Sequence, residues 1–265
     1  SSTDGDIIVF RSVDHVLFNI NRLNLRVVTD GPFAEDFAVS PGEVVELTEH
    51  SETLEFLFQF VYPVHPVLEN IPIETLCDIA EAAEKYRMAP AMSVCYIRMK
   101  LEYKTSPLRV MAYAHRHGYL ELLDLTAPLS VGIPVSQVLA APVSPSLFIS
   151  WASYNDAWAQ VLRKSHVESR MRYGHGRDDI DCMIWKDIVY TLEGRLGDDR
   201  GLAWLTDLDA LFADLEEKGG KCAWTPANAP VASPKCCQAQ LQHWRNDLKK
   251  NIEAIQSLST TGDAQ

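Results

Sequence analysis

The sequence lacks the short motifs that many enzymes carry. It contains neither a G-x-G-x-x-G nor a G-x-x-x-x-G-K-[ST] loop, so it has no signature for a phosphate held by backbone N–H groups. It also contains no G-x-S-x-G nucleophile elbow and no H-E-x-x-H motif. None of the eight histidines stands at a recognisable spacing from a nucleophile. These absences favour a protein that is not an enzyme.

Long apolar runs and basic charge are also scarce. No apolar run approaches the roughly 20 residues that a membrane-spanning helix needs. Lysine and arginine number 24 against 36 acidic residues, a net charge of −12. This balance disfavours direct nucleic-acid binding and anionic membrane surfaces, because both need basic groups. The opening SSTDGD has neither the basic nor the apolar region of a signal peptide, so we expect a cytoplasmic or nuclear protein.

Six cysteines without dense spacing do not indicate a secreted disulfide framework. The 265 residues are 47% hydrophobic and 23% charged, which is ordinary for a globular protein. A chain of this length can bury a core as one large domain or as two modest ones.

The strongest pattern lies between residues 43 and 99. Val44 to Leu47 read as a short strand, and Ser51 is expected to cap an apolar helix that ends at Tyr62-Pro63. Pro72 opens an amphipathic helix, and Pro90 separates it from another apolar helix. Upstream, residues 6–11 and 16–20 predict a hairpin, followed by a short helix to Val28.

This ordered set resembles the BTB/POZ domain. The family pattern "F-x-x-L-L-x-F-x-Y, then L-x-x-A-A-x-x-Y/L-x-M…C" corresponds to Phe56 to Tyr62, Leu76 to Met88, and Cys95. The earlier family pattern "F-x-h-H-r-x-x-L" is matched except that Asn21 replaces its histidine; the matching residues are Phe18, Ile20, Arg22 and Leu25. More loosely, the chain looks like fungal BTB proteins with an appended helical region.

The resemblance implies a non-enzymatic protein-interaction module. BTB domains commonly self-associate through their first strands and helix, and many are adaptors to a cullin-type ubiquitin ligase scaffold; a transcriptional partner is the other expectation. It implies interaction roles for Asp6, which is often buried at the dimer interface in the family, and for Arg22. A capped strand end and an exposed basic residue are the plain alternatives for these two positions.

The fold class we expect is α+β, with short strands and a cluster of helices over residues 5–104, followed by an all-α helical region. That region covers 105–258, and 259–265 are expected to be disordered. One helical stripe carries two tryptophans, and residues 163–179 are expected to form an exposed loop. Further helices are expected at 180–192, 202–215 and 236–258. The stripe is formed by Leu147, Trp151, Tyr154, Trp158 and Val161.

One dispersed set of side chains is suited to metal binding. Its spacing matches no known zinc motif, because two of the cysteines are adjacent and two others are separated by a whole helix. We therefore assign no metal or cofactor from the sequence. A zinc-stabilised helical binding protein, with its function in the C-terminal half, remains the alternative. The set consists of His175, Cys182, Cys222, Cys236, Cys237 and His243.

Overall fold

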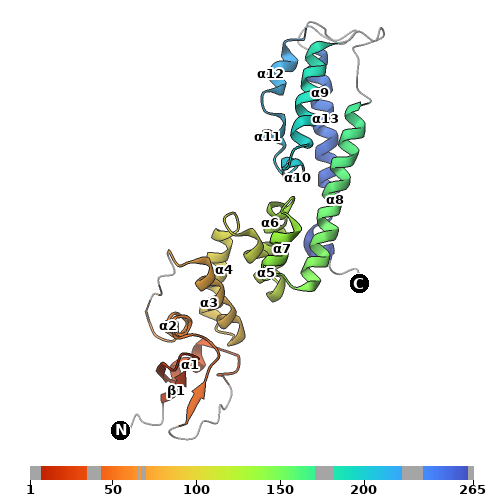
Figure 1. Cartoon of the computed structure of the whole chain (residues 1–265). Helices are drawn as coiled ribbons and strands as arrows, with labels where there is room; N and C mark the ends of the chain where they lie inside the picture. The colour runs from red at the N-terminus through yellow and green to blue at the C-terminus, as the bar shows by residue number, and fades with distance from the viewer. Residues whose placement is uncertain are drawn as a thin grey trace. The chain divides into compact units, whose positions relative to one another are not determined.

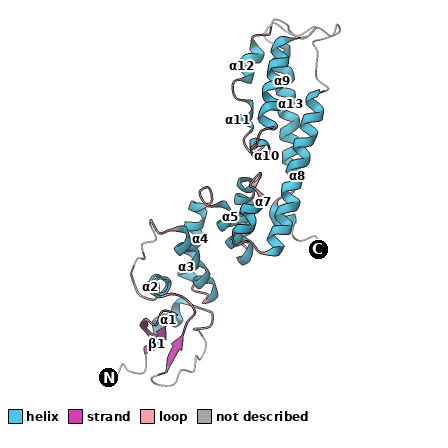
Figure 2. Cartoon of the chain, viewed as in Figure 1, coloured by secondary structure: helices cyan, strands magenta, loops and turns pink. Residues whose placement is uncertain are grey.

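The chain forms two compact units, Ser1–Leu122 and Leu123–Gln265, termed unit 1 and unit 2 (Figure 1). The structure is a computed structural model that describes residues 7–34, 43–64, 66, 70–170, 182–222 and 235–261. Unit 1 contains a small sheet and several helices, whereas the described part of unit 2 is helical (Figure 2). The predicted α+β class is confirmed.

The sheet of unit 1 has three strands in the order β2-β1-β3. Strands β1 (Ile7–Arg11) and β2 (Leu17–Asn21) form the predicted antiparallel hairpin. Strand β3 (Val44–Glu46) pairs in parallel with the other side of β1, so that β2 and helix α1 lie within the β1–β3 connection. Each of β2 and β3 therefore pairs on one side only within the described sheet.

Period-two alternation in the hairpin buries one face of the sheet. Ile8, Phe10 and Ile20 are buried, whereas their neighbours along the strands are more exposed. The ring of Phe10 lies 5.1 Å from that of Phe33 and 5.3 Å from that of Phe58. The apolar helix that carries Phe58 thus covers the inner face of the sheet.

That helix, α2 (Ser51–Gln59), is capped by a residue distant in sequence. Asp14, in the hairpin turn, accepts hydrogen bonds from the backbone N–H of Ser51 at 2.8 Å and from its hydroxyl at 2.6 Å. Hydrogen bonds from the hydroxyls of Ser51 and Ser12 hold the pKa of Asp14 well below its usual value. The prediction that Ser51 is the cap is wrong, because Ser51 is the first helical residue and donates to Asp14.

Helix α1 (Arg22–Val28) begins directly after β2. Its cap is Asn21, whose side chain accepts a hydrogen bond from the backbone N–H of Asn24 at 3.1 Å. Asparagine is among the best capping residues, so the departure from the family histidine at this position preserves a helix start.

Four further helices follow in the first half of the chain. Helix α3 has the predicted apolar stripe, and Tyr86 after it stacks on Phe33 with ring centroids 4.4 Å apart. Pro90 lies in the first turn of α4, where the lack of an N–H costs little. The helices are α3 (Ile73–Lys85), α4 (Ala89–Glu102), α5 (Pro107–His117) and α6 (Leu120–Thr126).

Two buried carboxylates tie the helices of unit 1 together. Glu84 of α3 accepts hydrogen bonds from the hydroxyls of Tyr113 and Tyr119, at 2.9 Å and 2.5 Å. Glu49 accepts from Lys85 at 2.7 Å and from Tyr86 at 2.6 Å. Because Tyr113 lies in α5, this network keeps α5 with unit 1, whereas the sequence-based boundary lies before it, between residues 104 and 105.

In unit 2, helices α8, α9 and α13 lie side by side (Figure 1). The predicted stripe of α8 is buried, and the indole N–H of Trp151 donates to the hydroxyl of Ser130 at 3.1 Å. Helix α8 continues to Arg170, so the loop predicted from residue 163 is wrong over its first turns. The elements up to this point are η1 (Ala127–Ser130), α7 (Val135–Ala140), α8 (Pro145–Arg170) and α9 (Met183–Leu196).

The helix predicted over 202–215 is instead three short helices. Asp207 caps the second, accepting from the N–H of Ala210 at 2.9 Å, and Asp214 has a positive φ of 67° before the third. These local polar interactions compete with a continuous helix. The short helices are α10 (Gly201–Trp204), α11 (Leu208–Phe212) and α12 (Leu215–Gly220).

The last long helix of the structure is shorter than predicted, and the first residues of the predicted disordered tail are helical. Helix α13 covers Cys236–Glu253, and a separate helix, α14, covers Leu258–Thr261. Asp124 accepts from the backbone N–H of Ser259 at 2.9 Å and from its hydroxyl at 2.7 Å. The disorder predicted from residue 259 is therefore wrong for residues 259–261.

Candidate functional site

The two interaction residues expected from the sequence lie at the start of the chain. Asp6 falls outside the described residues. Arg22 is the first residue of α1 and is half-buried, and its role in interaction stays a prediction. It directly follows Asn21, which caps the helix.

Apolar side chains are exposed on α1 and on the hairpin that precedes it. On α1, Leu23 and Val27 are separated by four residues and therefore share a face, and they are 58% and 86% exposed. On the hairpin, Ile7 and Leu17 are 43% and 56% exposed. We call these four residues the hairpin surface. Ile7 and Leu17 lie in the two end pairs of the ladder, so these residues spread along the hairpin and α1. Exposed apolar side chains of this kind are candidates for protein binding.

The outer face of the sheet continues this apolar character. In the observed register, Val9 pairs with Val44 across the β1–β3 ladder, and Val44 is exposed. Beside them, the guanidinium of Arg11 bonds both oxygens of Glu46. These hydrogen bonds raise the pKa of Arg11 and lower that of Glu46. The face thus combines valines with a neutralised ion pair.

A second candidate is a cluster of thiols in unit 2. The sulfur atoms of Cys182, Cys222 and Cys237 all lie within 4.8 Å of one another, and those of Cys182 and Cys237 are 3.6 Å apart. Burial, and then the neighbouring thiols, raise the pKa of Cys237 far above its usual value. Thiols so close together, two of them buried, form a set suited to a soft metal ion.

The other members of the predicted metal set do not join these three. Cys236 is adjacent in sequence but lies outside the cluster, and burial raises its pKa. His243 is exposed, with its Nε2 3.4 Å from Asp247. His175 falls outside the described residues. The cluster was not recognisable as a unit from the sequence, since its members come from three separate elements and only the fold brings them together.

The two cysteines of unit 1 do not contribute to the cluster. Cys95 is buried in α4, whereas Cys77 of α3 is only half-buried. Burial raises the pKa of Cys95 to about 12 and that of Cys77 to about 11. Both thiols are therefore neutral at physiological pH and behave as small apolar side chains.

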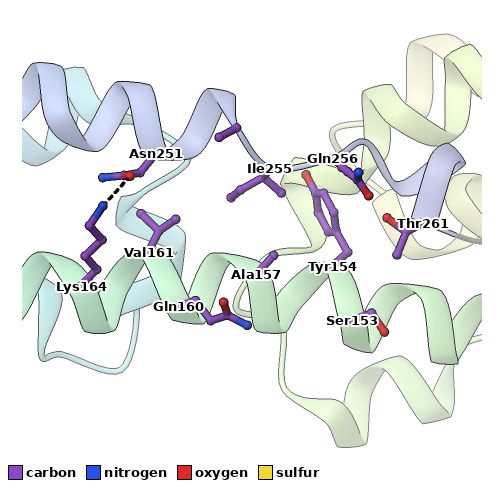
Figure 3. Close-up of a pocket in the computed structure, with 11 residues that line it drawn as sticks. Ser153, Tyr154, Ala157, Gln160, Val161, Lys164, Asn251, Ile255, Gln256 and Thr261 are labelled. Atoms are coloured by element: carbon purple, nitrogen blue, oxygen red, sulfur yellow. Dashed lines mark hydrogen bonds between the residues drawn. The ribbon is translucent and has the colours of Figure 1, made fainter.

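A hollow of about 500 Å³ lies along α8 in unit 2, beside the end of α13 and α14 (Figure 3). Tyr154, Val161 and Ile255 supply apolar surface, and the ammonium of Lys164 donates to the side chain of Asn251 at 3.0 Å. Burial raises the pKa of Tyr154. Among the lining residues, Lys164 alone carries a formal charge at neutral pH, so the hollow offers little for recognising a charged ligand.

Among the helices that the structure describes, none is both long enough and apolar enough to cross a bilayer. Comparison of the chain with models of known protein families, with curated proteins and with solved structures finds no match. The BTB/POZ resemblance therefore stays a prediction that rests on the residues quoted above.

Proposed function

We propose that the chain is a non-enzymatic protein-interaction module that self-associates through the hairpin surface. The observation that carries the proposal is the exposure of Leu23 and Val27 on one face of α1, together with the exposed side chains of Ile7 and Leu17 at the two ends of the hairpin ladder. Burying such side chains against another protein removes apolar area from water, which is the main driving force of association. The occupant we propose is a second copy of this chain.

Charge supports a second copy as the occupant. Residues 15–28 contain no aspartate or glutamate but include Arg22 and Arg26, in a chain with a net charge of −12. Two copies that meet elsewhere bring acidic surfaces together, and like charges repel. A contact made by residues 15–28 of both copies brings no carboxylates of this segment together, so it avoids this repulsion.

The sheet also supports the pairing. Strand β2 pairs with β1 alone among the described strands, so its outer edge offers backbone groups to another strand. A two-fold symmetric contact would place the same edge of both copies together. The BTB resemblance implies the same region, because its members self-associate through the first strands and helix.

Light scattering and sedimentation at micromolar concentration test self-association. We expect the full chain to have the mass of a dimer or a larger oligomer, and a mass of about 30 kDa at all concentrations would contradict the proposal. The double variant Leu23→Glu/Val27→Glu should be monomeric, because it places four carboxylates in a symmetric contact. Leu101→Glu is the matched control: Leu101 is an exposed leucine of α4, outside the hairpin surface.

We further propose that the self-associated module is an adaptor to a cullin-type ligase scaffold or to a transcriptional partner. The support is the resemblance alone. Co-purification of the full chain with a cullin scaffold tests the first partner. Binding that is retained by a variant purified as a folded monomer would separate the adaptor role from self-association.

A further inference from the structure

Three elements of unit 2 bring three thiols to one point. Cys182 is the residue before α9, Cys222 follows α12, and Cys237 lies in the first turn of α13. Helix α12 packs against both α9 and α13, so the convergence is set by helix packing. Cys222 and Cys237 are buried, and Cys182 is half-buried.

The sulfur spacing is that of a metal site. In a tetrahedral zinc site the metal–sulfur distance is about 2.3 Å, which places two ligand sulfurs about 3.8 Å apart. The 3.6 Å between the sulfurs of Cys182 and Cys237 agrees with this separation. A disulfide would require about 2.05 Å, and it would join only two of the three thiols. One ion at the centre accounts for all three.

Two long helices begin at the cluster. Helices α9 and α13 have 14 and 18 residues, and each directs its N-terminal end toward the cluster through Cys182 or Cys237. The positive end of a helix macrodipole stabilises nearby negative charge. The two macrodipoles would therefore partly offset the negative charge that three thiolates carry around a bound ion.

We propose that Cys182, Cys222 and Cys237 together bind one zinc ion. The thiol protons pass to solvent as the ion binds, and water fills the fourth position of the tetrahedron. The ion joins the starts of α9 and α13 to the end of α12. This proposal is independent of self-association, since it concerns unit 2 alone.

Metal analysis of the full chain, purified with a thiol reductant and without added zinc, tests the proposal. We expect about one equivalent of zinc per chain, because three thiolate ligands would retain the ion through purification. Less than about one-tenth of an equivalent, together with no uptake when zinc is added back to the reduced chain, would overturn it. Cobalt(II) provides the spectroscopic check, because thiolate coordination gives an intense charge-transfer band.

Variants locate the ion within unit 2. Cys182→Ser should lose at least nine-tenths of the bound zinc and the cobalt charge-transfer band, but it keeps a folded α9, because serine is a good residue for the position before a helix. Cys236→Ser is the matched control, since it removes an adjacent thiol that lies outside the cluster. Equal loss in both variants would contradict the assignment of the three ligands.

A disulfide is the competing outcome. If the chain purified under air contains no metal and shows a Cys182–Cys237 bond by peptide mapping, and if the reduced chain takes up neither zinc nor cobalt, the cluster is a redox pair and the zinc proposal fails. Zinc uptake by the reduced chain, blocked by prior alkylation of its thiols, would support it.

Discussion

The two units use different aromatic residues to build their cores. All six tryptophans of the chain lie in unit 2, between residues 151 and 244, whereas seven of the nine phenylalanines lie in unit 1. Three of the tryptophans, Trp151, Trp185 and Trp244, are fully buried between long helices. In unit 1, Phe10, Phe33 and Phe58 form ring contacts beneath the sheet.

Their buried polar groups differ as well. Unit 1 contains Glu49 and Glu84, two carboxylates bonded to tyrosine hydroxyls, whereas unit 2 contains hydroxyls bonded to indole N–H groups and the thiol cluster. Carboxylate networks respond to acid, and thiol clusters respond to metals and oxidants. Each unit should therefore be destabilised by conditions that leave the other intact.

Among changes that should destabilise one unit and not the other, we expect the largest effect from the loss of a buried tryptophan. Trp151→Ala removes a fully buried side chain and its hydrogen bond to Ser130, and we expect it to destabilise unit 2 by about 4 kcal/mol. Urea unfolding followed by tryptophan fluorescence reports unit 2 alone. Trp204→Ala, at a half-exposed position, is the control and should have a small effect. A parallel loss of unit 1, followed by amide hydrogen exchange of peptides from residues 7–122, would contradict the independence of the two units.

Removal of the Glu84 carboxylate should affect only unit 1. Glu84→Ala leaves the hydroxyls of Tyr113 and Tyr119 without their acceptor, and we expect a loss of about 2 kcal/mol. Urea unfolding followed by amide hydrogen exchange of peptides from unit 1 measures it. Tyr113→Phe removes one of the two donors and should cost about half as much. A shift in the tryptophan transition of unit 2 would contradict the independence of the units.

The cap of α1 should give a smaller effect. Asn21→Ala removes the acceptor for the backbone N–H of Asn24, and we expect a loss of about 1 kcal/mol from unit 1. Asn21→Ser should restore most of it, because serine caps helices nearly as well. Chemical denaturation of both variants checks the order. Equal destabilisation by alanine and serine would show that the side chain does not act as a cap.

The smallest effect is expected from acid. Protonation of Glu49 should lower the stability of unit 1 only at low pH and leave it unchanged at neutral pH. Burial by itself would raise the pKa of Glu49, but hydrogen bonds from Lys85 and Tyr86 outweigh it and leave the pKa below its usual value. The resulting stability is present above a pH of about 4.5, and it is lost as the pH falls through the lower pKa of the folded state. Glu49→Gln should flatten this part of the pH profile of unit 1.

Tyr119 should make the stability of unit 1 fall as the pH rises, which is the opposite dependence to that expected from Glu49. Burial, and then the carboxylate of Glu84, raise the pKa of Tyr119 to about 12. A raised pKa contributes stability below the unfolded value of about 10, and that stability is lost as the pH rises toward 12. Tyr119→Phe should therefore weaken the loss of unit 1 between these two pH values, as measured by helical circular dichroism.

Much of the fold could be predicted from the sequence, because its patterns are local. Alternation over residues 7–21 predicts the hairpin, and the stripe from Leu147 to Val161 predicts a buried helix. The cap of α2 could not be predicted, because Asp14 and Ser51 meet only in the folded sheet. The three short helices after Gly201 were missed because a regular leucine spacing hides the local polar turns that interrupt it.

The candidate sites were predicted less well, for the same reason. The hairpin surface follows partly from sequence, since the resemblance points to the first strands and helix, but which apolar side chains are exposed depends on the register of the sheet. For the thiol cluster, the sequence identified the three cysteines as candidate ligands, but it did not predict which members of the larger set would lie together. Cys222 meets Cys182 and Cys237 through helix packing, and no spacing rule describes a meeting of that kind.

The hydrogen bonds between Asp124 and Ser259 place the entrance and the exit of unit 2 beside each other. A domain whose ends are neighbours can be spliced into a surface loop of a host protein with little disturbance of either. We therefore expect unit 2 to fold when it is inserted into a surface loop of another protein. Its tryptophan emission would report there on the state of the inserted domain, without a signal from unit 1.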